Sequence, residues 1–251
     1  MKISIITSTY NSLSTVQSSL DSFASQTYKN KEHVFIDGAS KDGTKELLQG
    51  YCQKHENSIL VSEPDKGIYD ALNKGVANST GDIIGICHSD DFFADEQVLS
   101  KVANAFGDKY IQAVYGDLQY VSKNNPENVV RNWVSGDYKL SLLKKGWMPP
   151  HPAFFVKKEL YEKFGNFDLS YKIAADYDLM MRFLGVHGIV PGYIPEVLCK
   201  MRVGGESNRS LKNIWRKSCE DYRVMKSNGI GGLGTLFMKN FSKIGQFVKK
   251  G

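Results

Sequence analysis

The apolar and polar runs in the first half of the chain predict an α/β unit. Amphipathic helices are indicated where apolar residues recur every three or four positions, and the first is expected to begin at a cap on Asn11 or Ser12. Strands that alternate with helices form a mostly parallel sheet covered by helices, so we expect a Rossmann-like α/β fold. The expected strands are short apolar runs that end in polar residues, at 3–7, 33–37, 59–61, 81–87 and 113–117.

The pattern changes after residue 117. Residues 118–121 and 129–134 read as two strands of a hairpin, which predicts a small antiparallel portion. A short helix over 158–164, a helix over 174–184, a last strand over 193–202 and a charged helix to about Ser227 follow. We expect one domain over 1–207, with halves 1–117 and 118–207, and a helical extension over 208–251.

The charge is unevenly distributed. The net charge is +5, and nine basic residues stand against Glu220 and Asp221 from Ser210 onward. A basic, amphipathic tail favours an anionic membrane surface as a partner and does not require nucleic acid, although its apolar residues could instead pack on the domain. Those tail residues are Leu233, Leu236, Phe237, Lys239, Phe241, Lys243, Ile244, Phe247, Val248, Lys249 and Lys250.

Several classes of protein are excluded by missing patterns. The four cysteines form no CxxC pair, which argues against a zinc knuckle or a disulfide framework. The N-terminus enters a strand pattern without an apolar leader, and no run approaches the ~18 apolar residues of a membrane span, so a cytoplasmic location is expected. Neither the dinucleotide-binding fingerprint nor a P-loop is present.

Two adjacent carboxylates, Asp90 and Asp91, follow the apolar run at 83–87. Ligands of open α/β sheets bind at the carboxyl ends of the strands, and hard oxygen ligands suit Mg²⁺ or Mn²⁺. Ser89-Asp90-Asp91 is also a good turn or helix cap, so the turn alone does not decide between the two interpretations. His88 and His151 are expected to form local hydrogen bonds rather than to bind the ion.

Other polar residues lie at similar positions. Asp37 ends a predicted strand, where an acid can bind a base or a ribose. Lys66 precedes a helix start, where a phosphate would meet both an ammonium and free N–H groups, although it could equally be a solvated surface lysine. Asp176 and Asp178 begin a helix, and the helix dipole alone explains one of these two acids but not both.

Taken together, these motifs resemble the family 2 glycosyltransferases of the GT-A fold, over roughly residues 1–205. The matching segments occur in the family's order, and Glu63 to Ala71 and His151-Pro152 are similar to bacterial members that build surface polysaccharides. The segments are 3–11, Ile36 to Thr44, Asn73-Lys74-Gly75, Gly81-Asp82, Ser89-Asp90-Asp91 and Ala175 to Arg182.

The resemblance implies a role for each matching position. Asp91 would hold the divalent ion, Mn²⁺ or Mg²⁺, and Asp176 would be the general base, with Asp178 as the alternative because Ala175 stands where many members have Glu. Trp147, His151 and Asp178 would line the sugar pocket. The nucleotide would contact Ser8, Thr9, Tyr10, Asp37, Lys66 and Asp90.

The expected function is therefore a metal-dependent inverting glycosyltransferase, transferring a hexose or N-acetylhexosamine in bacterial surface-polysaccharide synthesis. The expected donor is a nucleoside-diphosphate sugar, UDP rather than GDP, and the acceptor a growing or polyprenyl-linked glycan. The tail would hold the enzyme at the cytosolic face of the inner membrane. One rival is a catalytically silent nucleotide-sugar-binding module. The other is a nucleotidyltransferase, whose glycine-rich basic loop is missing from residues 8–13.

Overall fold

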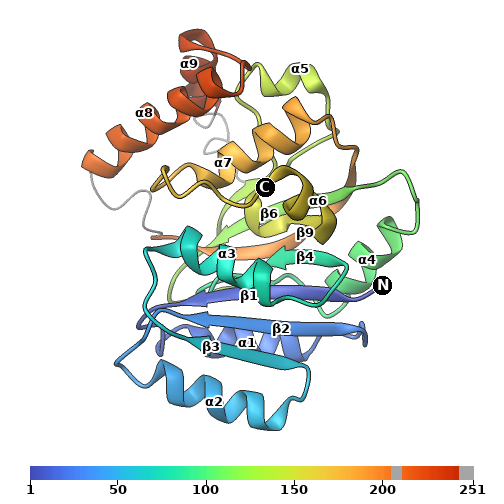
Figure 1. The fold of residues 1–251 in the computed structure, drawn as a ribbon, viewed down its shortest axis with the longest axis vertical. Helices are drawn as coiled ribbons and strands as arrows, with labels where there is room; N and C mark the ends of the chain where they lie inside the picture. The colour runs from blue at the N-terminus through green and yellow to red at the C-terminus, as the bar shows by residue number, and fades with distance from the viewer. Residues whose placement is uncertain (205–210, 243–251) are drawn as a thin grey trace.

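The computed structural model describes residues 1–204 and 211–242. Within them, nine strands form one sheet with the order β3-β2-β1-β4-β8-β6-β9-β5, and β7 pairs with β6 (Figure 1). Strands β1 to β4 are parallel, whereas β8 runs antiparallel to β4 and β6. The strands are β1 (Ile3–Thr9), β2 (Lys31–Asp37), β3 (Ser58–Ser62), β4 (Ile83–Ile86), β5 (Phe92–Phe93), β6 (Ala113–Val121), β7 (Val129–Trp133), β8 (Phe154–Lys157) and β9 (Pro191–Arg202).

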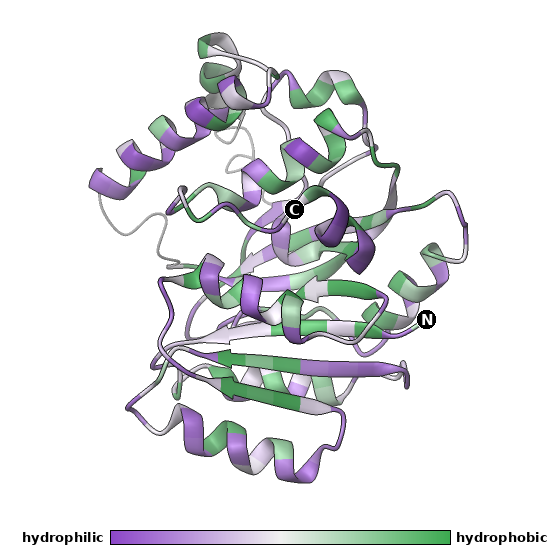
Figure 2. Ribbon diagram, viewed as in Figure 1, coloured by the Kyte–Doolittle hydropathy of each residue, from purple (hydrophilic) through white to green (hydrophobic). Residues whose placement is uncertain are grey.

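Helices cover both faces of this sheet. Alternate residues of β1 and β2 face α3 and α7 on one side and α1, α2 and α4 on the other, which gives a three-layer core. Figure 2 shows the apolar middles of β2 and β3 against the banded surface of α2. The helices are α1 (Val16–Ala24), α2 (Thr44–Lys54), α3 (Ile68–Asn78), α4 (Val98–Ala105), α5 (Leu140–Leu143), η1 (His151–Ala153), α6 (Lys158–Phe164), α7 (Ala175–Met180), η2 (Met181–Val186), α8 (Leu211–Ser227) and α9 (Leu233–Ser242).

The predicted architecture is confirmed, with two local corrections. Helix α1 begins at Val16 rather than after Asn11 or Ser12, because Asn11 and Ser12 belong to a loop whose N–H groups donate to Ser40 Oγ and Thr44 Oγ1. The helix predicted over 174–184 divides into α7 and the π-helical turn η2.

The C-terminal helices pack on the main core. Val224 and Met225 of α8 are buried beside α7, and Leu236 of α9 packs against the same cluster (Figure 1). The assignment of Lys239 to the basic surface of the tail is wrong, because its side chain is buried and pairs with Asp221 at 2.8 Å. The rest of the predicted basic stripe, at 243–251, lies outside the described residues. In the described ranges, no helix is both long and apolar enough to cross a bilayer.

Glu32 joins the amino ends of three strands. Its carboxylate accepts hydrogen bonds from Ser4 Oγ at 2.5 Å and Thr80 Oγ1 at 2.6 Å, and it pairs with the Lys2 ammonium. Burial alone would raise the pKa of Glu32, but the bonds from Lys2, Ser4 and Thr80 outweigh it and lower the pKa from 4.5 to about 2.

This pKa predicts an acid-dependent stability. Because the folded pKa lies below the unfolded one, the contribution of Glu32 is complete above pH 4.5 and is lost as the pH falls toward 2. Glu32→Gln should therefore lower the free energy of unfolding by about 2–3 kcal/mol at pH 7. Urea unfolding of both proteins between pH 7 and 3 measures the difference, which should shrink with acid. A difference independent of pH would contradict this account.

Candidate active site

The acidic turn, His88 to Asp91, follows β4, and its two carboxylates differ in their exposure to solvent. Asp90 is partly exposed, whereas Asp91 is 0% exposed. Neither carboxylate oxygen of Asp91 has a hydrogen-bond partner in the described part of the chain. Burial, and secondarily Asp90, raise the pKa of Asp91 well above its usual range, with Arg202 opposing. The Asp91 carboxyl is therefore enclosed by the protein, and of the pair only Asp90 is accessible from solvent.

Arg202, at the end of β9, lies against this turn. Its guanidinium donates to the Asp90 carbonyl oxygen at 2.6 Å and to Ser18 Oγ at 3.0 Å, and it lies 4.9 Å from the centre of the Phe92 ring. The arginine places a fixed positive charge beside the carboxylates, where an anionic ligand would bind. The sequence pattern did not reveal this role, since only the pairing of β9 with β5 brings Arg202 to the turn.

The carboxylate of Asp37 forms all its hydrogen bonds with groups inside the protein. Its side chain is 0% exposed, and its oxygens accept bonds from Thr9 Oγ1, from Ser62 Oγ and from both the N–H and the hydroxyl of Ser40. In this structure Asp37 therefore ties together the loops after β1, β2 and β3 and does not present a free acceptor to a base.

The loops that Asp37 connects form the rim next to β1. Tyr10 is 68% exposed, Ser8 is partly buried and Thr9 is buried. Asn11 and Ala39 adopt positive φ values of 50° and 59°, which non-glycine residues rarely do and which are concentrated at functional loops. A Cβ at Gly38 would lie 2.5 Å from Asp65 Oδ2, so only glycine lets these loops approach.

Lys66 lies just before α3, as predicted. The residue is exposed, and its N–H donates to Asp70 Oδ2 at 2.9 Å. The turn before the helix is closed by Asp65, whose Oδ1 accepts from the Gly67 N–H at 2.8 Å, and α3 itself has no side-chain cap in the described chain.

Asp176 lines the larger of two cavities. It begins α7, its side chain is 19% exposed, and its Oδ1 accepts from the Tyr69 hydroxyl at 3.2 Å. The cavity has a volume of about 750 Å³ and reaches Arg202, which in turn contacts the acidic turn. Its wall includes Tyr120, Trp147, His151, Asp176, Arg202 and Lys217.

His151 connects Asp176 to the acidic turn. Its Nδ1 lies 3.3 Å from Asp176 Oδ2, and its Nε2 lies 2.8 Å from Nε2 of His88. Burial, together with His151, lowers the pKa of His88 to about 3, and burial also lowers the pKa of His151 although Asp176 opposes it. Both imidazoles are neutral at pH 7 and form the local hydrogen bonds that the sequence predicted.

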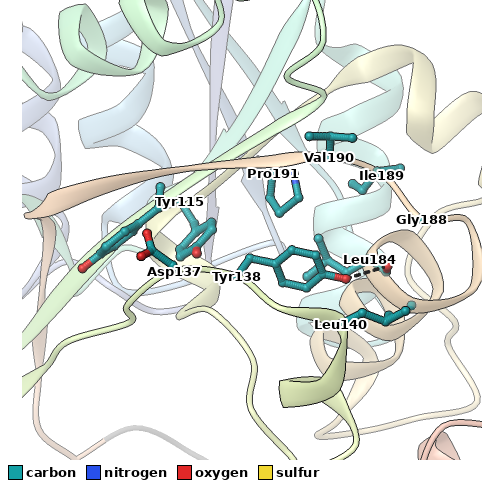
Figure 3. Close-up of a pocket in the computed structure, with 11 residues that line it drawn as sticks. Tyr115, Asp137, Tyr138, Leu140, Leu184, Gly188, Ile189, Val190 and Pro191 are labelled. Carbon is teal, nitrogen blue, oxygen red and sulfur yellow. Dashed lines mark hydrogen bonds between the residues drawn. The ribbon is translucent and has the colours of Figure 1, made fainter.

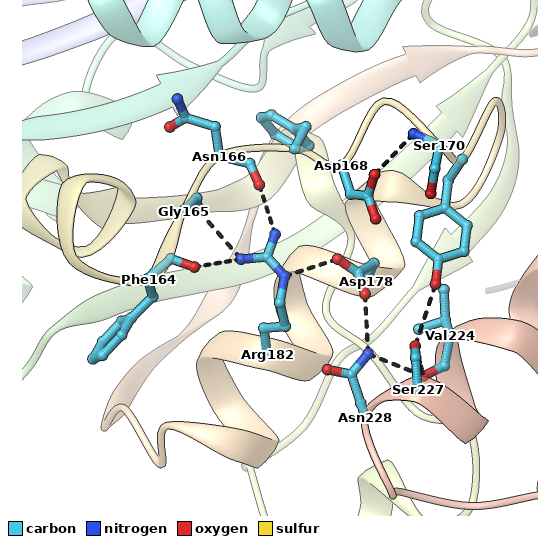
Figure 4. Close-up of polar contacts among 12 residues, drawn as sticks. Phe164, Gly165, Asn166, Asp168, Ser170, Asp178, Arg182, Val224, Ser227 and Asn228 are labelled. Atoms are coloured by element: carbon cyan, nitrogen blue, oxygen red, sulfur yellow. Dashed lines mark hydrogen bonds and ion pairs between the residues drawn. The ribbon is translucent and has the colours of Figure 1, made fainter.

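Asp178, which the sequence predicted for the sugar pocket, is not among the residues that line this cavity. Its carboxylate accepts from Arg182 Nε at 2.8 Å and from Asn228 Nδ2 at 3.0 Å (Figure 4). The same guanidinium donates to the carbonyl oxygens of Phe164 and Asn166. Asp178 therefore fastens α7 to the loop after α6 and to the end of α8.

The smaller cavity contains none of the predicted residues. It has a volume of about 500 Å³ between the start of β9, η2 and the segment before α5, and Tyr138 crosses it to bond the Leu184 carbonyl oxygen (Figure 3). Trp147 lies close to it, since its ring packs edge-on against Tyr115 while its Nε1 donates to the Ser135 carbonyl oxygen. Asp137 is the one carboxylate among its lining residues in the described chain.

The C-terminal helices complete the larger cavity. Lys217 and Asp221 of α8 and Lys239 of α9 line it, and the Lys239 ammonium lies over the Tyr177 ring. Burial lowers the pKa of Lys239 to about 8 against the attraction of Asp221. The sequence pattern predicted 208–251 as an extension and did not reveal these contributions.

The described residues would supply some, but not all, of the ligands of a divalent ion. In the described ranges, no three His, Cys, Asp or Glu side chains are grouped as a complete ligand set. Mg²⁺ and Mn²⁺ sites of nucleotide-dependent enzymes commonly use one or two carboxylates, with phosphates and water as the other ligands. The acidic turn supplies carboxylates of that kind.

The strand order and the acidic turn after β4 define a GT-A fold, and the sequence matches this class. The family model described as glycosyl transferase family 2 matches residues 4–167. The chain therefore belongs to glycosyltransferase family 2, as its motifs predicted.

Curated relatives agree with this assignment. An uncharacterized glycosyltransferase of Mycobacterium tuberculosis is 32% identical over 208 residues, 81% of this chain and 76% of the relative. A PGL/p-HBAD biosynthesis glycosyltransferase of Mycobacterium bovis is 31% identical over 208 residues, 82% of this chain and 78% of the relative.

Solved structures share the fold. The S. aureus TarS fragment 1–349 in complex with UDP has a TM-score of 0.67 at 17% identity, with 91% of this chain and 65% of that chain covered. The mannosyltransferase PcManGT of Pyrobaculum calidifontis, in complex with GDP-Man and Mn²⁺, has a TM-score of 0.67 at 22% identity, with 90% and 63% covered. The chain thus spans about two thirds of these structures.

Proposed function

We propose that this glycosyltransferase transfers a sugar, with inversion, from a nucleoside-diphosphate sugar to a glycan or polyprenyl-linked glycan of the bacterial surface. The observation that carries the proposal is one cavity that joins Asp176 to Arg202 and, through it, to the acidic turn. This reaction requires a carboxylate on the acceptor side of the sugar, and positive charge or a metal ion on the diphosphate side.

On the donor side, the rim around Ser8, Thr9 and Tyr10 would hold the nucleoside, with Asp37 keeping that rim in shape. Arg202 would contact the diphosphate, together with Lys66 if the exposed lysine folds toward the ligand. A bound Mg²⁺ or Mn²⁺ would supply positive charge that stabilises the leaving phosphate. We assign Asp90, rather than the predicted Asp91, as its ligand because only Asp90 is accessible.

On the acceptor side, Asp176 would remove the proton from the attacking hydroxyl. A neutral hydroxyl is a weak nucleophile, so a carboxylate within hydrogen-bond reach raises the rate. Attack on the face of the sugar away from the diphosphate inverts the anomeric carbon. Trp147 and Tyr120 line the same cavity and offer the apolar surfaces on which sugar rings stack.

The substrate classes are supported by the related proteins. TarS has been solved with UDP-GlcNAc, and PcManGT with GDP-Man and Mn²⁺. We favour UDP for this chain, and the PGL/p-HBAD relatives favour a cell-surface glycoconjugate as the product.

A nucleotide-release assay tests the proposal. UDP-GlcNAc, UDP-glucose, UDP-galactose and GDP-mannose would each be incubated with the protein and Mn²⁺, and the free nucleotide diphosphate measured. We expect one donor to be turned over and to raise the melting temperature, because a ligand that binds only the folded state stabilises it. Tight binding of a donor without any turnover would instead indicate a silent nucleotide-sugar-binding module.

We also propose that α8 lies on an anionic membrane surface. Lys212, Trp215 and Arg216 share one face of this helix at spacings of three and four residues, and Trp215 is 72% exposed. An exposed tryptophan between two cations suits the boundary between lipid headgroups and acyl chains.

Vesicle flotation measures this contact. Trp215→Ser/Arg216→Glu should bind phosphatidylglycerol vesicles at least about tenfold more weakly than the wild type, because each basic residue contributes ~1 kcal/mol at such a surface. Tyr110→Ser, which removes a 70% exposed aromatic away from α8, is the matched control and should bind normally. Equal flotation of all three proteins would remove the membrane proposal.

A further inference from the structure

His88 of the acidic turn and His151 are hydrogen-bonded to each other, and His151 lies beside Asp176. His88 lies two residues before Asp90, and His151 begins the 3₁₀ turn η1 between β7 and β8. The two Nε2 atoms are 2.8 Å apart, and the rings meet edge to face at 62°. His151 Nδ1 then reaches Asp176 Oδ2 at 3.3 Å.

The partners of these nitrogens determine where the protons lie. Asp176 is an acceptor when ionised, so His151 presents an Nδ1–H to it. His88 Nδ1 is buried and has no partner in the described chain, and a buried N–H without an acceptor is the costlier state for that atom. The proton of His88 therefore lies on Nε2, and His151 Nε2 accepts it.

This arrangement holds the Asp176 carboxylate from both sides. The single hydroxyl proton of Tyr69, on α3, is shared between the Ile173 carbonyl oxygen at 2.6 Å and Asp176 Oδ1 at 3.2 Å, while His151 Nδ1 lies 3.3 Å from Oδ2. By donating to Nε2, His88 satisfies the second ring nitrogen of His151 and holds the imidazole ring beside the carboxylate. The orientation of Asp176 thus depends on a residue of the acidic turn.

We propose that His151 and His88 are positioning residues: His151 orients Asp176 toward the acceptor hydroxyl, and His88 holds the His151 ring in the orientation that lets it do so. The kinetic part of this inference rests on the function proposed above. The structural part does not, because it concerns the protein without substrate.

The tautomers are visible by NMR. Long-range ¹H–¹⁵N spectra of the wild type should show His151 protonated at Nδ1 and His88 at Nε2, with the resonances assigned from His88→Gln and His151→Asn proteins. In His88→Leu, which removes the donor, we expect the ¹⁵N resonance of the unprotonated His151 Nε2 to move downfield, whereas in His88→Gln, whose amide can still donate, it should stay near its wild-type position. An unchanged His151 Nε2 resonance in a folded His88→Leu protein would overturn the role of His88.

The kinetic test separates positioning from simple packing. His151→Leu should lower kcat about 10²-fold, the size of effect that misplacing a catalytic group by about 1 Å can produce, with the KM for the donor unchanged. His151→Asn, whose amide nitrogen occupies the position of Nδ1, should recover most of the loss. If both variants lose kcat equally while their melting temperatures match that of the wild type, the positioning role is rejected. A wild type that transfers no sugar would instead refute the proposed function and leave the NMR result standing.

Discussion

Asp176→Asn is expected to lower kcat for sugar transfer by about 10³-fold while leaving the affinity for the donor nucleotide unchanged. An amide of the same shape can keep the contacts with Tyr69 and His151 but cannot accept the proton of the acceptor hydroxyl, and general-base catalysis contributes ~10²–10⁴-fold. Steady-state transfer rates, with donor binding followed by calorimetry, give the two quantities separately.

Asp178→Asn is the matched control for this experiment. The residue lies two positions away in the same helix, but its carboxylate binds Arg182 and Asn228 outside the cavity. We expect the substitution to destabilise the fold by roughly 2–3 kcal/mol, since a charge-assisted bond to a buried group is lost, and to leave kcat of the folded enzyme near normal. If Asp178→Asn removed transfer while Asp176→Asn did not, the two assignments would have to be exchanged.

The second large effect is expected at the acidic turn. Asp90→Asn should lower kcat/KM by roughly 10²-fold or more and should weaken Mn²⁺-dependent donor binding, because it removes the accessible carboxylate of the pair. Asp91→Asn should change both quantities little, since the Asp91 carboxyl is buried and, unlike that of Asp90, is not accessible from solvent.

Measuring donor affinity with and without Mn²⁺ for both variants distinguishes the two assignments. If Mn²⁺ no longer strengthened donor binding in Asp91→Asn but still did so in Asp90→Asn, Asp91 would be the metal ligand. This result would also mean that the Asp91 side chain turns out of the core when the donor binds.

The sequence predicted the parts of the site that depend on local pattern. The apolar run of β2 ends in Asp37 and that of β4 is followed by the acidic turn, so the positions of both followed from the apolar runs alone. The start of α7 at Ala175 followed from the same kind of pattern, and Asp176 does line the main cavity.

What the sequence did not predict depends on contacts between distant segments. Asp37 is taken up by partners from three different loops, and His88 and His151 meet although they are 63 residues apart. Lys239 reads as one more basic residue of the tail, yet packing against Tyr177 and Asp221 buries it. Hydrophobic periodicity carries no information about such pairings, because it reports which face of one element is buried and not which residue lies opposite.

The central claim is that Asp176 activates the attacking oxygen on the face of the sugar opposite the diphosphate. Proton NMR of the sugar first released from an α-linked UDP-sugar, with water as the acceptor, tests this claim without knowledge of the natural acceptor. The account predicts that the β-anomer appears first and that the α-anomer grows only by mutarotation. Release of the α-anomer first would contradict it.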